Sequence, residues 1–237
     1  MSANPVAIIA GAGGAGAATA ASLAADGFTV VVLDSRAEAA EAVATALSGV
    51  GQSAEAHGID LLDVDSVQAL RDDLVARLGR VDVIVHLVGG WRGTKTLSVE
   101  SVANWNALHP PIVGTLAVLT TVFADDVRQS PRGRVFMVTS TTAASPTAGN
   151  IAYAAAKSAA EAWMSGVAHF LRDTDAASVT IAVKALLTDP MIASDPDKSW
   201  PGYTHVTVLG DAIAQASVTG VGNGTRLDLT GAGYSGS

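Results

Sequence analysis

The chain has 237 residues, of which 49% are hydrophobic, and its mean hydropathy is +0.36. Its formal net charge of −8 disfavours binding to nucleic acid or to an anionic membrane surface. It contains no cysteine, which excludes disulfides and cysteine metal ligands, and no apolar run reaches the roughly 18 residues of a membrane span. The N-terminal residues lack the basic segment of a secretory signal. We therefore expect a cytoplasmic protein.

A glycine-rich loop follows the first predicted strand, Val6–Ala10, and a predicted helix over 17–26 follows the loop. The loop fits the pattern G-x-G-x-x-G with Gly11, Gly13 and Gly16, and Gly14 lies within it. Glycines at this spacing permit a tight turn and let the backbone approach a pyrophosphate at the helix N-terminus. Because the loop lies between a strand and a helix, we predict dinucleotide binding rather than an ordinary flexible turn.

The next predicted strand, Thr29–Asp34, ends in a carboxylate. Asp34 lies 18 residues after Gly16, close to where an acidic residue of a dinucleotide-binding fold bonds the ribose hydroxyls of adenosine. A carboxylate repels a 2′-phosphate, so NAD(H) is favoured over NADP(H), although a nearby Arg36 can accommodate that phosphate. Helix capping by Asp34 is the structural alternative.

A helix over 37–47, a strand over 53–58 and a helix over 65–79 come next. Three acidic residues cluster before the second helix, Asp60, Asp63 and Asp65. The cluster lacks the full ligand pattern and the glycine of a calcium loop. We interpret it as a solvated turn with capping carboxylates and predict no metal site.

The fourth predicted strand, 81–86, ends at His86 and leads into Gly89, Gly90 and Trp91. A buried histidine bonded to the backbone is a more common role for His86 than a proton relay. Gly89 allows close approach of a cofactor. Trp91 either stacks on a flat heterocycle near the nicotinamide or covers the sheet edge.

The region 98–126 is predicted to be mostly helical, with a break at Pro110 and Pro111. A strand over 135–140 follows and carries Ser140 at its carboxyl end, where α/β folds place their ligands.

Tyr153 and Lys157 lie four residues apart in an Ala-rich segment that is predicted to be helical to about residue 172. They share one helix face, so a lysine ammonium there favours the ionised phenol and lowers the pKa of Tyr153. This makes Tyr153 a candidate proton donor or acceptor. An exposed tyrosine beside a solvated lysine is the structural alternative, but Ser140, 13 residues upstream, favours catalysis.

The remaining segments are a strand over 178–185, a loop over 188–204, a helix over 206–216, a strand over 226–230 and a loose tail over 231–237. The loop is rich in Asp, Pro and Ser, and we interpret it as a mobile substrate lid. The alternation of strands and helices predicts one α/β domain over 1–237, with a doubly wound parallel sheet of about seven strands.

At Ser140, Tyr153 and Lys157, the sequence resembles the short-chain dehydrogenase/reductase family, and the resemblance covers nearly the whole chain. The resemblance implies an oxidoreductase in which Tyr153 transfers the proton, Ser140 orients the substrate carbonyl and Lys157 bonds the nicotinamide ribose. It also implies cofactor contacts from the residues Asp60, Leu61, Gly89, Tyr153, Lys157 and Thr188. Substrates would be small ketones or secondary alcohols, and the protein would be a homodimer or homotetramer.

Several family features are absent. Pro111 lies near the place of the family's catalytic asparagine, so the usual proton route behind the lysine is not evident. The family's Pro-Gly after the sixth strand is missing, and His86-Leu87-Val88-Gly89 replaces its Asn-Asn-Ala-Gly.

Two alternatives stay open. Gly89-Gly90-Trp91-Arg92-Gly93 resembles a motif of quinonoid dihydropteridine reductases, a divergent branch of the family, and Met191 lies in a segment similar to their Asp-Thr-Pro-Met. The candidate substrate contacts are thus Trp91, Ser140 and Met191. Ser140 argues against the dihydropteridine reductases, because they usually lack that serine. The other alternative is a dinucleotide-binding sensor that has lost turnover.

Overall fold

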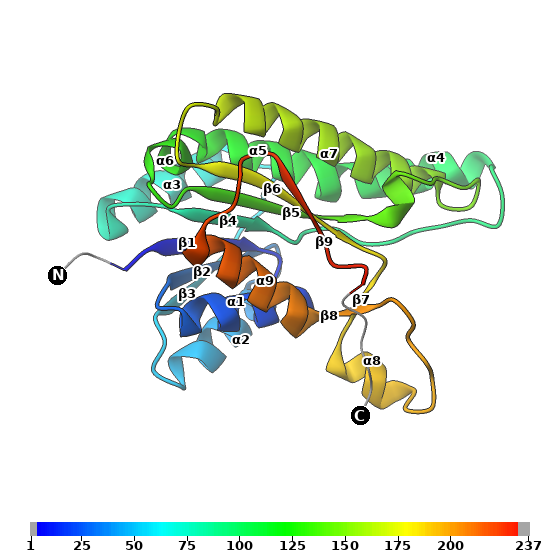
Figure 1. The fold of residues 1–237 in the computed structure, drawn as a ribbon, viewed down its shortest axis with the longest axis horizontal. Helices are drawn as coiled ribbons and strands as arrows, with labels where there is room; N and C mark the ends of the chain where they lie inside the picture. The colour runs from blue at the N-terminus through cyan, green and yellow to red at the C-terminus, as the bar shows by residue number, and fades with distance from the viewer. Residues whose placement is uncertain (1–3, 232–237) are drawn as a thin grey trace.

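A computed structural model describes residues 4–231 of the chain. Its centre is a parallel sheet of seven strands, as the sequence predicted (Figure 1). The strands, in sheet order, are β3 (Ala54–Gly58), β2 (Thr29–Asp34), β1 (Val6–Ala10), β4 (Val83–His86), β5 (Arg134–Ser140), β6 (Ala177–Val183) and β9 (Thr225–Asp228). Successive strands are added on one side of β1 up to β3 and on its other side from β4 onward. The reversal of strand order between β1 and β4 is a switch point, which opens a crevice at the carboxyl edge of the sheet.

The central strands are runs of β-branched and apolar residues because both faces of the sheet are covered. Every residue of β1, β4 and β5 is buried. Helices α1 (Gly14–Ala25), α2 (Ala37–Ser48) and α9 (Val206–Thr219) cover one face. The other face carries α3 (Val64–Leu78), α4 (Val99–His109), α5 (Thr115–Val122), α6 (Ala124–Gln129) and α7 (Ile151–Phe170) (Figure 1). One hydrophobic cluster lies on each side of the sheet.

The double proline between α4 and α5 does not break the helical path, so the predicted break is wrong. His109 and Pro110 both have α-helical backbone angles, and Pro110–Gly114 forms a π-helical segment. The Thr115 N–H donates to the Pro110 carbonyl, five residues back. Because neither proline has an N–H to offer, the wider turn accommodates their missing bonds within a helical conformation.

The segment after β6 is only partly a loop. Leu186–Leu187 (β7) pairs with Thr204–His205 (β8) in a second, two-stranded sheet, and a short helix, α8 (Asp189–Ser194), lies between them. Figure 1 shows α8 standing away from the main sheet at the carboxyl end of the strands. The predicted lid at 188–204 therefore leaves the main sheet as one segment, and the pairing of β7 with β8 joins its two ends.

Other boundaries agree with the predicted ones to within a few residues. A three-residue 3-10 turn (Thr141–Ala143) follows β5. None of the helices within residues 4–231 is long and apolar enough to span a membrane. The predicted loose tail falls almost wholly on 232–237, outside the described residues.

Candidate active site

The glycine loop between β1 and α1 is shaped by a backbone contact that only glycine permits. Gly11 has a φ of +102°, and a Cβ atom built on Gly16 would lie 1.8 Å from the Gly11 carbonyl oxygen. Helix α1 begins at Gly14 with no side-chain cap and no acidic residue in its first turn. Its first N–H groups are thus open to an anion, which fits the pyrophosphate of a dinucleotide.

Asp34, at the end of β2, is tied to this loop. One carboxylate oxygen accepts the Ala12 N–H at 2.8 Å, and the other accepts the Arg36 N–H at 3.0 Å and Arg36 Nε at 3.4 Å. Partial burial raises the pKa of Asp34, but the hydrogen bonds from Ala12 and Arg36 outweigh this and hold the pKa below its ordinary value. Asp34 is therefore an anion that faces the loop, and Arg36 is already engaged with it.

Asp34 and Arg36 line a hollow of about 440 Å³ together with Gly11, Gly13, Asp60, Leu61 and Gly89. Six of these seven residues, all except Arg36, were predicted from the sequence to bind the cofactor. Asp60 accepts the Leu62 N–H at 2.9 Å, and Asp63 caps α3 through Ser66. The capping role expected of the acidic cluster is thus confirmed for Asp63, whereas Asp60 bonds within the turn that precedes α3.

A second, larger hollow of about 790 Å³ adjoins the carboxyl ends of β4, β5 and β6. It brings together Ser140, Tyr153 and Lys157, the three residues predicted to be catalytic, with His86, Gly89 and Trp91. Further lining residues include Ala15, Thr142, Val183, Lys184 and Tyr203. The two hollows share Leu87, Val88 and Gly89, so they are neighbours along the strand β4 exit.

Ser140 is 3% exposed at the end of β5, and its orientation is set by Thr142. The Thr142 N–H and hydroxyl both donate to Ser140 Oγ, at 3.3 and 3.1 Å. Because Oγ accepts these bonds, its own proton can be donated to another oxygen in the hollow, such as the Tyr153 oxygen or that of a substrate. Thr142 was not among the residues predicted from the sequence, although the run Ser140-Thr-Thr indicates such a local turn.

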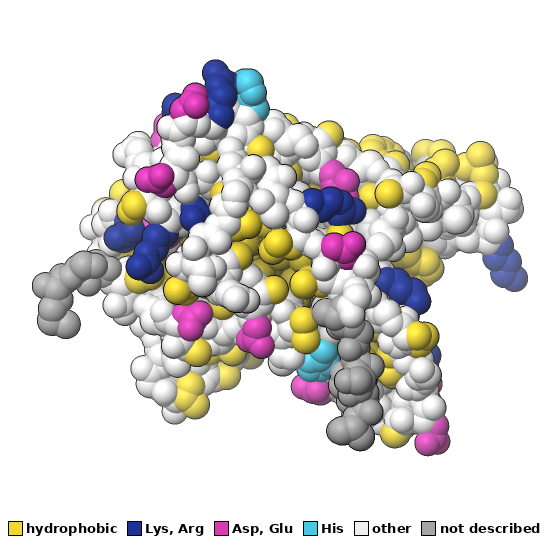
Figure 2. All heavy atoms as spheres, viewed as in Figure 1, with side chains coloured by type: hydrophobic (Ala, Val, Ile, Leu, Met, Phe, Trp, Pro, Cys, Tyr) yellow, Lys and Arg dark blue, Asp and Glu magenta, His cyan; other side chains and the backbone are white. Residues whose placement is uncertain are grey.

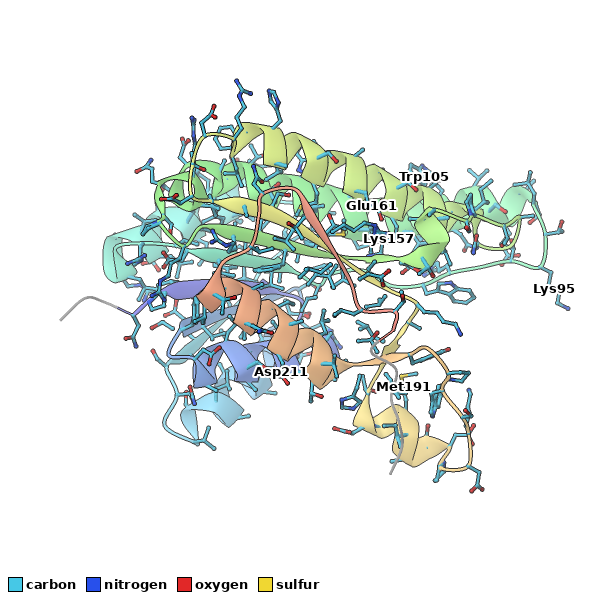
Figure 3. All side chains as sticks on the ribbon, viewed as in Figure 1. Lys95, Trp105, Lys157, Glu161, Met191 and Asp211 are labelled. Carbon is cyan, nitrogen blue, oxygen red and sulfur yellow. The ribbon has the colours of Figure 1, made fainter. Side chains whose placement is uncertain are left out.

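Lys157 lies beneath Tyr153 on the buried face of α7. Figure 3 shows Lys157 between this helix and the sheet. Its Nζ donates to the Val138 carbonyl at 2.7 Å and lies 5.9 Å from the centre of the Tyr153 ring. Burial lowers the pKa of Lys157 to about 8, while the Glu161 carboxylate one turn further along opposes that change.

The pKa of Tyr153 differs in direction from the expected one. Burial raises it, and a hydrogen bond with Ser140 offsets only part of the rise. The predicted lowering by Lys157 is wrong in this structure, because both groups are withdrawn from water and desolvation dominates the phenol. The two side chains do share one helix face, as their spacing predicted.

His86 is buried, as expected, but its partner is a side chain. Its Nε2 lies 2.8 Å from Thr115 Oγ1, and that hydroxyl donates to the Pro111 carbonyl at 2.7 Å. Since the hydroxyl proton is used, Nε2 must carry the proton that joins the pair. Burial, with the charge of Lys157, lowers the pKa of His86 to about 3. A neutral histidine that donates to Thr115 does not act as an acid near neutral pH.

Three further residues were predicted to contact the cofactor or the substrate, and they lie in different places: Thr188, Trp91 and Met191. Thr188 occupies the N-cap position of α8 without a side-chain capping bond and lies against the glycine loop, since a Cβ on Gly14 would be 2.9 Å from Thr188 Cγ2. Trp91 is 68% exposed at the hollow's rim. Met191 lies on α8 (Figure 3) and is not among the described residues that line the hollow, so its substrate contact stays a prediction.

Comparisons with known proteins show which family the chain belongs to. The family model for short chain dehydrogenases matches residues 5–198. The 7alpha-hydroxysteroid dehydrogenase of Escherichia coli (strain K12) is 30% identical over 218 residues, covering 90% of this chain and 85% of the relative. The cis-4-hydroxycyclohexanecarboxylate dehydrogenase of Sinomonas cyclohexanicum is 31% identical over 218 residues, covering 92% and 80%. A solved 7 alpha-hydroxysteroid dehydrogenase, complexed with NADH and 7-oxo glycochenodeoxycholic acid, has a TM-score of 0.80 at 24% identity, covering 98% and 95%.

The chain therefore belongs to the short-chain dehydrogenase family. The class predicted from the sequence, a nicotinamide-dependent oxidoreductase of this family, is confirmed.

Proposed function

We propose that this oxidoreductase uses NAD(H) and interconverts a small ketone and its secondary alcohol, with Tyr153 as the proton-transferring residue. The observation that carries the proposal is the convergence of Ser140, Tyr153 and Lys157 on one hollow beside the glycine loop. Both curated relatives are named as dehydrogenases of hydroxyl-bearing ring compounds, which supports an alcohol–ketone reaction.

Each residue has a distinct part in the reaction. A bound nicotinamide supplies or accepts the hydride. The Ser140 hydroxyl, held by Thr142, donates to the substrate oxygen and stabilises the negative charge that develops there. Tyr153 gives its proton to that oxygen in reduction and removes it in oxidation. Lys157, fixed by the Val138 carbonyl, lies where it can bond the nicotinamide ribose and place a positive charge near the phenolate.

Asp34 supports NAD(H) over NADP(H). Its carboxylate faces the cofactor hollow, and a 2′-phosphate there would meet a negative charge. Arg36, the residue that could neutralise such a phosphate, is paired with Asp34.

Calorimetric binding of NADH and NADPH tests this proposal, followed by turnover of cyclic and aliphatic ketones with the tighter cofactor. We expect NADH to bind at least about tenfold more tightly, because one unfavourable charge contact costs roughly 1–2 kcal/mol. The isosteric variant Asp34→Asn keeps the side-chain shape and is expected to reduce that ratio. Equal binding of both cofactors by the wild type would contradict the role of Asp34.

The exposed Trp91 at the rim of the hollow favours a second candidate, reduction of a flat heterocycle such as a quinonoid dihydropterin. A dihydropterin in the same panel separates the two. Turnover of the dihydropterin alone would replace the ketone proposal. The third possibility, a dinucleotide-binding sensor, predicts cofactor binding with no turnover of either class.

We also propose a cytoplasmic homodimer or homotetramer whose subunits are single domains. One sheet draws its strands from Val6 to Asp228, which supports the single domain. An apolar hollow of about 760 Å³ on the α5–α7 face includes Trp163 and Phe170, which are 40% and 38% exposed. Figure 2 shows more hydrophobic side chains over the end of the molecule near α4. Light scattering tests the oligomer: a monomeric wild type would contradict it, and Phe170→Glu is expected to lower the mass.

A further inference from the structure

The wall of the catalytic hollow has an unusual charge balance. Its cations are Lys157 and Lys184, and none of the described residues that line it is an Asp or Glu. The chain as a whole carries a net charge of −8, so this local excess of positive charge runs against the composition. Lys157 is buried beneath Tyr153 and already has a role. Lys184 is exposed, and the proposed reaction does not use it.

The register of the sheet places Lys184 beside the reacting centre. Val183 is the partner of Ser140 in the β5–β6 pair, so Lys184 is the next residue along the chain after the partner of the serine. Neighbouring strands lie about 4.8 Å apart, so the two backbones are close at this point. Thr188, which contacts the glycine loop, is four residues further along the chain. Lys184 therefore belongs to the Ser140 end of the hollow rather than to the loop that would hold the pyrophosphate.

The Lys184 ammonium is held in place but not saturated. Its Nζ donates to the Pro201 carbonyl at 2.8 Å and lies 5.9 Å from the centre of the Tyr203 ring. An ammonium has three N–H donors, so two remain for a ligand. Tyr203 also lines the hollow, and Trp91 lies at its rim, so a flat or apolar body between Ser140 and Lys184 would meet aromatic surfaces.

We infer that Lys184 is a specificity-determining residue that binds an anionic group, a carboxylate or similar oxyanion, on the substrate. The substrate would carry this group at the end opposite the carbonyl or alcohol that Ser140 and Tyr153 address, with a short flat or apolar body between. The inference rests on the proposed function, because it takes the reacting oxygen to lie at Ser140. The ligand's anion would replace solvent around the two free N–H donors and make a charge-assisted hydrogen bond.

A pair of probes that differ only in charge tests the inference by binding. The probes are 4-acetylbenzoate and its neutral isostere 4-acetylbenzamide, titrated into the enzyme–NAD⁺ complex, which cannot reduce the acetyl group, and followed by tryptophan fluorescence. The wild type is expected to bind the acid about tenfold more tightly than the amide, because a hydrogen bond to a charged group is stronger than one to a neutral group, even after solvent screening. This preference should shrink in 0.5 M NaCl.

Three variants sharpen the test. Lys184→Met is expected to abolish the acid-over-amide preference, and Lys184→Arg to retain it. Lys198→Met removes a positive charge from the neighbouring 188–204 segment, where Lys198 lies 4.1 Å from the Trp200 ring and outside the residues that line the hollow. It should leave the preference in place.

Other results would overturn the inference. These are equal binding of both probes by the wild type, an equal loss of preference in Lys184→Met and Lys198→Met, or a Lys184→Met variant whose main defect is weak NADH binding. Reduction of the acetyl group, followed separately by NADH absorbance, reports on the proposed function. A charge preference without turnover would thus support Lys184 and count against the ketone reaction.

Discussion

The two hollows at the carboxyl edge of the sheet are built in different ways. The hollow around Asp34 is formed largely by backbone: Gly11 and Gly16 allow a close approach, and the carboxylate of Asp34 accepts the Ala12 N–H of the loop. The hollow around Ser140 is formed by side chains that come from distant segments, such as Lys157 from α7 and Lys184 from the β6 exit. A site formed by backbone suits a cofactor that is the same in every reaction. A site formed by side chains from separate elements can be altered by substitution to suit a different substrate.

The largest effect is expected where the backbone approach is tightest. Gly16→Ala would force its Cβ against the Gly11 carbonyl, and we expect it to lower the free energy of unfolding by about 3 kcal/mol. Gly13→Ala is the matched control, since nothing lies within 4 Å of a Cβ there. Urea denaturation of both variants measures the difference. If the two variants were equally stable, the cofactor hollow would not depend on that backbone contact.

Lys157 provides a test on the side-chain hollow. The pKa of Lys157 is lowered to about 8 in the folded protein, against about 10.5 in the unfolded chain. Between these two pH values the unfolded chain therefore keeps the Lys157 proton and the folded protein releases it. The cost of the buried charge is fully present below pH 8 and is relieved as the pH rises toward 10.5. The wild type should therefore gain about 3 kcal/mol relative to Lys157→Met across that window.

Urea denaturation at pH 7, 8, 9 and 10 checks the effect of Lys157, because subtracting the values of Lys157→Met removes the titration of all other groups. A parallel pH dependence in the two proteins would show that Lys157 keeps its ordinary pKa.

A smaller effect is expected at the His86–Thr115 pair between the two hollows. Thr115→Val preserves the shape but leaves the His86 Nε2–H without its acceptor, and we expect a loss of about 1–2 kcal/mol in the free energy of unfolding. Thr115→Ser keeps the hydroxyl and should lose less than half as much. Thermal unfolding of the two variants distinguishes the lost hydrogen bond from a packing defect, which would affect the serine variant more.

Features that depend on local spacing were predictable from the sequence. The glycine loop, the alternation of strands and helices, and the shared face of Tyr153 and Lys157 follow from patterns along the chain. The π-helical turn at Pro110 was not predicted, because the usual rule breaks a helix at proline and ignores a wider hydrogen-bond pattern.

The direction of the Tyr153 pKa was also missed, since burial depends on how α7 packs on the sheet. Lys184 was overlooked because its surroundings, Pro201 and Tyr203, come from 17 and 19 residues further along the chain.

We propose that Tyr153 transfers the proton, and single-turnover oxidation of bound NADH by a ketone substrate isolates that step. Tyr153→Phe keeps the ring and removes only the hydroxyl, so the rate should fall by about 10² to 10⁴ while NADH affinity stays within a few-fold of the wild type. A Tyr153→Phe enzyme that reduces the same ketone at the wild-type rate would contradict the account.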